Sequence, residues 1–299
     1  MNWVARLFAQ RAEPEPKSVA AQPASAAISA PPPIERVSAL PYLPWISGIP
    51  MLKDVALSAD EQRILDELAK VLKLPIIPEN MLPRAAELLP QLIGLLRETQ
   101  LPLQAVAERV NKDGVLAAEV MRLASSPFYR VQGDVGDTVQ AIRLIGSVGL
   151  QTVIARVVLK PIYRSSAGLM NANLAARLWK HSEALAHHAS VLAAAAGQEA
   201  FDGYLAGMLH SIGWKIALCA MERAGISPNA HPSNAFVAAV LEQVHRLFGH
   251  AAQRWTITPG FMAFAQDARQ HGLAGGRHAL APVLRQAQLL CGIEDGLPR

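Results

Sequence analysis

Apolar residues recur at three- and four-residue intervals along most of the chain beyond residue 55, as they do in helices that bury one face. The first such helix is predicted after Ser58, a helix-capping residue type, and before Pro75, which cannot continue the helical hydrogen bonds. Because no segment shows sustained alternation of apolar and polar residues, the pattern predicts an all-α fold. Further helices are expected over residues 84–99, 103–110, 115–125, 137–146, 148–163, 173–196, 201–221, 234–248, 259–270 and 279–291.

The N-terminal part of the chain has a different pattern. Residues 12–54 are rich in Pro, Ala and Ser, which predicts a flexible linker. Residues 1–11 form a short amphipathic segment, which we interpret as a docking peptide for a protein partner or a membrane surface. A disordered start is the alternative, because so short a helix is unstable by itself. The docking face would consist of Trp3, Val4, Leu7 and Phe8. Residues 55–295 are then expected to form one helical domain.

The composition narrows the class of protein. Hydrophobic residues make up 51% and aromatic residues 5% of the 299 residues, which favours helices packed on helices. The net charge of +4 comes from scattered basic residues, so we expect no nucleic-acid partner; DNA binding stays a weak alternative. We find no secretory signal and no apolar stretch of the roughly 18–20 residues that span a bilayer. These features predict a cytoplasmic protein without a transmembrane segment, in which Cys219 and Cys291 are buried thiols.

Two neighbouring helical segments carry the candidate chemistry, "LWKHSEALAHHA" (178–189) and "FDGYLAGMLHSIGWKIAL" (201–218). They place His181 and His210 on or beside apolar faces. A metal-dependent phosphohydrolase would need a histidine from one helix and an adjacent His-Asp pair on another, because carboxylates balance the charge of the cation. Here His210 is followed by Ser211, whose neutral hydroxyl is a poor ligand for a hard cation. The pattern therefore predicts no metal, no cofactor and no catalytic residues.

The other residues near this pair have structural interpretations. The nearest acids in sequence, Asp202 and Glu222, lie two and three helical turns from His210. We expect His181 and His210 to be hydrogen-bonded inside a helical bundle. Gly207 and Gly213 are expected to permit close helix packing, and Trp179 and Trp255 to anchor the core. His188 shares the face of His181, His187 is expected to be exposed, and four further histidines are interpreted as surface residues: His245, His250, His271 and His278.

The order and spacing of five segments resemble the HDOD family, HD-related output domains of bacterial signalling. The segments are "MLPRAAELLPQLIGLLRE", "LQAVAERVNKDGVLAAEVMRLASSPFY", "VGDTVQAIRLIGSVGLQTVI", "LWKHS" and "AGMLHSIG", and the resemblance spans about residues 80–270. It implies a two-lobed helical bundle whose second lobe is HD-domain-like. It also implies a role in signal transduction through a protein partner or a small ligand, such as a nucleotide second messenger.

The chain departs from the family pattern where an active HD enzyme would bind metal. The family commonly has His-Asp where this chain has His210-Ser211, and a paired histidine near the end is replaced within "FAQDARQ" (264–270). The resemblance therefore implies a non-catalytic regulatory protein in which His181, His210 and Ser211 are vestigial positions. One alternative is a divergent HD-type metal-dependent phosphohydrolase acting on a nucleotide. Another is a ligand receptor that retains the pocket at His181 and His210 without the chemistry.

Overall fold

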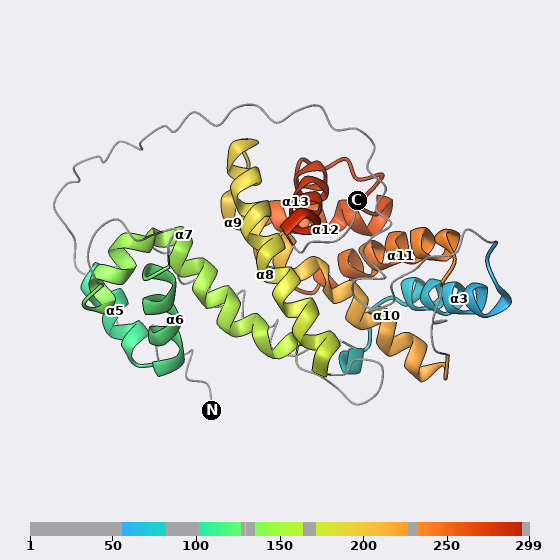
Figure 1. The fold of residues 1–299 in the computed structure, drawn as a ribbon, viewed down its shortest axis with the longest axis horizontal. Helices are drawn as coiled ribbons and strands as arrows, with labels where there is room; N and C mark the ends of the chain where they lie inside the picture. Colours follow the sequence, from blue (N-terminus) through green and yellow to red (C-terminus); the bar gives the residue numbers. More distant parts are fainter. Residues whose placement is uncertain are drawn as a thin grey trace.

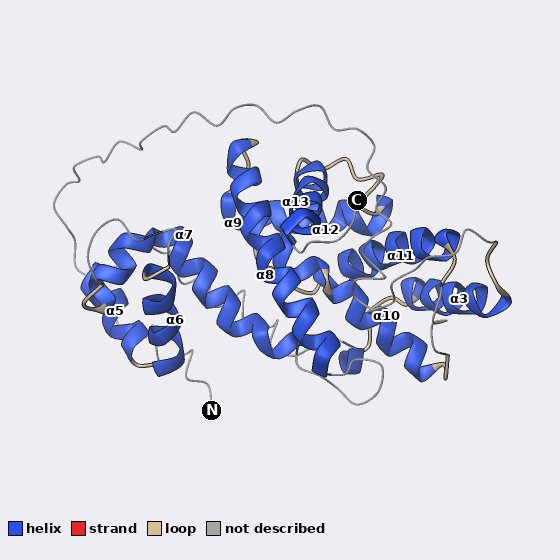
Figure 2. Ribbon diagram, in the orientation of Figure 1, coloured by secondary structure: helices blue, strands red, loops and turns tan. Residues whose placement is uncertain are grey.

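The computed structural model describes residues 56–81, 102–126, 129, 135–163, 172–226 and 232–294. These parts of the chain are helical and contain no β-strand (Figure 2), which confirms the predicted all-α fold. With the labels of Figure 1, the helices are α3 (Ala59–Lys73), η1 (Glu79–Met81), α5 (Leu103–Asn111), α6 (Gly114–Ala124), α7 (Thr138–Leu159), η3 (Lys160–Tyr163), α8 (Ala172–Ala195), α9 (Ala200–His210), α10 (Ile212–Arg223), α11 (Asn234–Ala252), α12 (Pro259–His271) and α13 (Leu280–Glu294). The peptide 1–11, the linker 12–54 and the helix predicted over 84–99 lie outside the described residues.

The helices form two lobes with separate apolar cores (Figure 1). In the first lobe, α5 and α6 pack against α7 around residues such as Val120 and Ile142. The second lobe contains α3 and α8–α13, and its larger core includes four fully buried phenylalanines: Phe236, Phe248, Phe261 and Phe264. Helix α7 begins in the first lobe and ends in the second, and Val158 packs against both cores. The two-lobed helical architecture is therefore as predicted.

Local sequence signals account for where several helices begin. Ser58 caps α3, Asp113 caps α6 and Asp137 caps α7, each by accepting hydrogen bonds from backbone N–H groups of the first turn. Gly146 was expected to end a helix. It has a φ of 66°, which is outside the helical region and is open to glycine at little cost. The chain therefore kinks within α7 at the predicted position and then continues as a helix.

One predicted helix is in fact two. The segment 201–221 was expected to be continuous, but α9 ends at His210 and α10 begins at Ile212. Ser211 between them has ψ of −9°, and its carbonyl accepts a hydrogen bond from Trp214 N–H. After this turn α10 packs against α3 and α11, whereas α9 packs mainly against α8. The sequence does not show this break, because the apolar periodicity continues through Ser211. The break becomes apparent only in the folded protein, where the two helices pack against different partners.

A second correction concerns the helix Thr138–Tyr163, which is long and apolar enough to cross a bilayer by length and composition. No such stretch was expected from the sequence. Half of the most apolar 18-residue stretch of this helix is buried inside the protein. Ile145 lies in the first core and Leu159 in the second. A helix that contributes to two cores needs apolar residues on several sides, so packing accounts for its composition.

The buried carboxylate of Glu61 connects α3 to α11. Its Oε2 accepts from Ser58 N–H at 2.8 Å and from the Ser233 hydroxyl at 3.0 Å, and its Oε1 accepts from Ser233 N–H at 2.7 Å. Ser233 in turn caps α11. Burial by itself would raise the pKa of Glu61, but these hydrogen bonds outweigh burial and the pKa lies below the ordinary 4.5. One carboxylate thus completes the caps of two helices.

We predict that Glu61→Ala lowers the free energy of unfolding by about 2–4 kcal/mol at pH 7, because buried N–H groups lose their charged acceptor. Since the folded pKa is depressed, the contribution is present above pH 4.5 and is lost as the pH falls below it. Denaturant unfolding of both proteins between pH 7 and pH 4 measures the effect. The control is Glu67→Ala on the same helix, which removes only an exposed ion pair with Lys70 and should cost about 0.5 kcal/mol or less. Equal midpoints for wild type and Glu61→Ala would contradict the prediction.

Candidate functional site: a buried histidine cluster in the second lobe

Close packing of α8 on α9 positions the two histidines identified from the sequence. A Cβ atom on Gly207 would lie 2.5 Å from the Cα of Ala186, and one on Gly213 would overlap the carbonyl of Val244. Both glycines therefore permit close helix packing, as predicted. Across the α8–α9 contact, Tyr163 donates a hydrogen bond to Met208 O and accepts one from Ser182 Oγ at 3.4 Å. His181 and His210 face each other within this frame.

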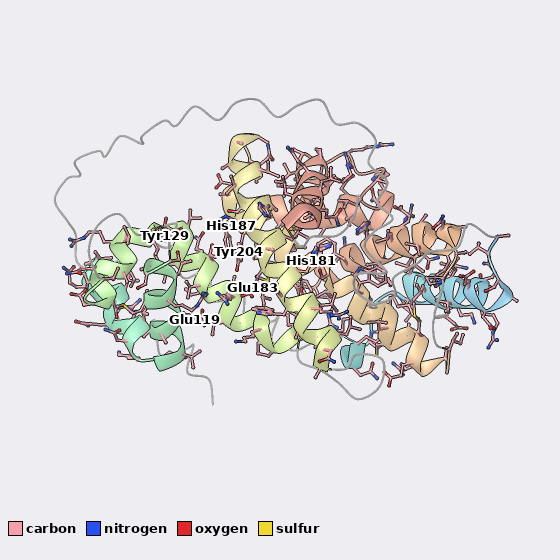
Figure 3. The ribbon with its side chains drawn as sticks, in the orientation of Figure 1. Glu119, Tyr129, His181, Glu183, His187 and Tyr204 are labelled. Atoms are coloured by element: carbon pink, nitrogen blue, oxygen red, sulfur yellow. The ribbon has the colours of Figure 1, made fainter. Side chains whose placement is uncertain are left out.

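Three histidine rings from three helices form the cluster. The ring centroid of His210 on α9 lies 6.2 Å from that of His181 on α8 and 6.3 Å from that of His245 on α11. His181 and His210 are buried, with exposed fractions of 4% and 1%, and His245 is partly buried. We call these three residues the histidine cluster. Figure 3 shows His181 within the second lobe.

The hydrogen bonds of His210 fix its protonation pattern. Its Nδ1 lies 3.2 Å from the carbonyl oxygen of Gly207. A carbonyl only accepts, so Nδ1 carries the proton and Nε2 carries the lone pair. The amide nitrogen of Gln288 on α13 lies 3.5 Å from Nε2 and is directed at that lone pair. The nitrogen that would bind a metal therefore faces a hydrogen-bond donor.

All three imidazoles are neutral near pH 7. Burial lowers the pKa of His181 to about 3, of His210 to about 4 and of His245 to about 3. A charge on His210 would lower the pKa of the other two further by repulsion, whereas the hydrogen bond to Gly207 O partly opposes the shift at His210 itself. The histidine cluster therefore places three polar but uncharged imidazoles inside the second lobe.

Carboxylates do not complete this site within the described residues. Ser211, in the position of the expected acid, is fully buried, and its Oγ lies 3.3 Å from His210 Nδ1. Asp202 lies two turns away on α9, about 12 Å along the axis, and accepts a hydrogen bond from Thr258, the N-cap of α12. Glu222 is exposed on α10. No group of three His, Cys, Asp or Glu side chains in the described ranges is arranged to hold a metal ion.

The sequence interpretation missed one partly buried and one buried histidine. His245 and His250 were assigned to the surface, but His245 belongs to the cluster, and His250 is 4% exposed with Nε2 2.8 Å from Leu74 O. The spacing of Leu241, His245 and Phe248 places His245 on the apolar face of α11, and this signal could have identified it. His187 is exposed as expected, and Trp255 is buried in the second core. Cys291 is buried and Cys219 partly buried, both as free thiols.

A family model described as the HDOD domain matches residues 82–269, more than half of the chain. The chain belongs to the HDOD family. The match begins before α5 and ends within α12, so it includes all three helices that carry the histidine cluster. The identification agrees with the resemblance seen in the sequence, and the matched range includes helices of both lobes but neither α3 nor α13.

Individual relatives are distant. An uncharacterised protein of Treponema pallidum (strain Nichols) is 23% identical over 235 residues, which are 69% of this chain and 45% of the relative, so this chain spans less than half of that protein. A crystal structure from Shewanella amazonensis SB2B, provisionally named a metal-dependent phosphohydrolase, is similar with a TM-score of 0.55 at 19% identity, covering 79% of this HDOD chain and 85% of the other. An HDOD domain protein of unknown function from Geobacter sulfurreducens is similar with a TM-score of 0.50 at 20% identity. The match covers 79% of this chain and 80% of the other. At these identities the likeness shows the fold.

The histidine cluster should make stability depend on pH. Its folded pKa values lie below the ordinary 6.5, so unfolding takes up protons below pH 6.5, and stability falls from there towards pH 3–4. We predict that His245→Gln reduces the loss of unfolding free energy between pH 7.5 and pH 5 by about 1–2 kcal/mol relative to wild type. Denaturant unfolding at both pH values measures this difference. The control His187→Gln changes an exposed histidine and should follow wild type; identical pH profiles for His245→Gln and wild type would refute the assignment.

Proposed function

We propose that this HDOD protein is a non-catalytic bacterial signal-transduction protein that acts by binding a protein partner or a small ligand. The observation that carries the proposal is the environment of His210, where imidazoles, the Ser211 hydroxyl and the Gln288 amide are all neutral. A divalent cation there would have no adjacent carboxylate to offset its charge or to orient an attacking water molecule. These residues do not fit the metal centre of a phosphohydrolase.

A zinc ion held by three histidines needs no carboxylate ligand. It requires three lone pairs that converge on a single point. In this protein the lone pair of His210 Nε2 is directed towards the Gln288 amide, so it is not free to join those of His181 and His245 at one point. The alternative of a divergent HD-type phosphohydrolase acting on a nucleotide therefore has support only from its shared fold.

Metal binding and turnover test the proposal directly. We expect purified protein, incubated with Mn²⁺ or Zn²⁺ and desalted, to retain much less than one equivalent and to leave bis(p-nitrophenyl) phosphate unhydrolysed. The matched control is His210→Gln, which should give the same background in both assays. One tightly bound equivalent of metal, with turnover that His210→Gln abolishes, would establish the phosphohydrolase instead.

Partner binding is proposed to involve the N-terminal peptide, whose residues lie outside the described ranges. Its apolar face and the long Pro- and Ala-rich segment behind it suit a tethered docking element of a cytoplasmic protein. We predict that Trp3→Ala/Phe8→Ala reduces recovery of a co-purifying partner to background, because the face loses its two aromatic anchors. Quantitative affinity purification measures recovery. Arg6→Ala, which leaves the apolar face intact, is the control, and undiminished recovery with the double variant would refute this part.

A further inference from the structure

Charged side chains gather where the first lobe faces α8 and α9. Arg156 on α7 lies between two carboxylates, with Nη1 3.6 Å from Glu119 Oε2 on α6 and Nη2 2.6 Å from Glu183 Oε1 on α8. Arg122 on α6 pairs with Glu119 at 2.9 Å. Figure 3 shows Glu119, Glu183 and Tyr204 in this region between the lobes. We call Glu119, Arg122, Arg156, Glu183 and Tyr204 the interlobe cluster.

Positive charge exceeds negative charge in this region. The charges of Arg122 and Lys160 act on Glu183, so three cations, with Arg156, face two carboxylates. Burial raises the pKa of Glu183 to about 7, although the charges of Arg122 and Lys160 lower it. The contact of Glu183 Oε1 with Arg156 is close but does not have hydrogen-bond geometry. The carboxylates therefore only partly neutralise the arginines.

Several donors in the cluster have no acceptor among the described residues. Arg122 Nε donates a hydrogen bond to Glu119 Oε2, whereas the two Nη groups of Arg122 make no hydrogen bond to the described residues. Tyr204 is 6% exposed, yet no described group hydrogen-bonds to its hydroxyl. The charges of Glu183, Arg122 and Glu119 act on that hydroxyl, so it faces the same cluster. Burial raises the pKa of Tyr204, which keeps the hydroxyl protonated and able to donate.

We propose that the interlobe cluster binds a phosphate-bearing small ligand, whose anionic oxygens accept hydrogen bonds from Arg122, Arg156 and Tyr204. Guanidinium groups present several N–H donors in a plane and match phosphate oxygens in geometry as well as charge. The Tyr204 hydroxyl, which has no acceptor among the described residues, would gain a hydrogen bond from such a partner. The physiological role of this site rests on the proposed regulatory function. The proposal specifies the class of ligand that such a function would use.

This site is separate from the histidine cluster. Glu183 and His181 are two residues apart on α8, so their side chains leave the helix on different sides. The interlobe cluster instead joins α6, α7 and α8 with α9. Among the described helices, α5 and α6 pack mainly on each other and on α7, which is kinked at Gly146. A ligand held by α6 and α9 would therefore fix the position of one lobe on the other.

Calorimetric titration of the full chain at low ionic strength, where charge interactions are least screened, tests the inference with three probes: inorganic pyrophosphate, guanosine monophosphate and guanosine. We expect pyrophosphate and guanosine monophosphate to bind and guanosine not to bind. Tighter binding of guanosine monophosphate than of pyrophosphate would add a nucleoside contact to the same phosphate site. Failure of both phosphate probes to bind, or equal affinity for guanosine and its monophosphate, would overturn the proposal.

Two variants locate the site. Arg122→Gln and Tyr204→Phe should each weaken the binding of the phosphate probes by about tenfold or more, and Tyr204→Phe removes a hydroxyl with no described hydrogen bond, so folding should be preserved. Arg63→Gln is the matched control, because Arg63 forms the same i,i+3 pair with an acid on an exposed helix face, at 3.0 Å. If both variants bind the phosphate probes as tightly as wild type, or if Arg63→Gln weakens binding equally, the site does not lie at the interlobe cluster. Phosphodiester hydrolysis at the histidine cluster would contradict only the proposed function.

Discussion

The close contact between α8 and α9 is the constraint on which the second lobe depends. Backbones can approach this closely only where side chains are small, and Gly207 lies directly against Ala186. Any Cβ at residue 207 would force the two helices apart. Because α8 also packs against α13, the same contact brings Gln288 to His210. The geometry of the histidine cluster thus follows from a few positions that carry almost no side chain.

The protein separates its uncharged polar groups from its charged ones. Inside the second lobe, low polarity favours neutral imidazoles, and His210 is satisfied by a carbonyl, a hydroxyl and an amide. Between the lobes, side chains that are about one quarter exposed carry an Arg156-centred network. Partial contact with water lowers the desolvation penalty of these charges, which would be much larger for fully buried charges. The two regions are therefore suited to different tasks, one to holding the fold and the other to recognising an anion.

Much of the fold was predictable because its signals are local. The caps at Ser58, Asp113 and Asp137 and the kink at Gly146 depend on the chemistry of single residues. The family likeness came from ordered short segments, and the exchange of an acid for Ser211 was visible in the sequence. By contrast, the break between α9 and α10 and the burial of His245 and His250 arise from which helices pack together. Apolar periodicity is almost the same on either side of these features.

The sequence by itself determined an all-α chain, the helix boundaries set by caps, glycine and proline, and a candidate pair, His181 and His210, without a neighbouring acid. Only the tertiary structure decided that His245 and Gln288 join this pair and that Glu61 caps two helices. It also brought Arg156 between carboxylates of two lobes. The physical reason is that each of these groups meets partners tens of residues away, and their spacing along the chain carries no record of such contacts.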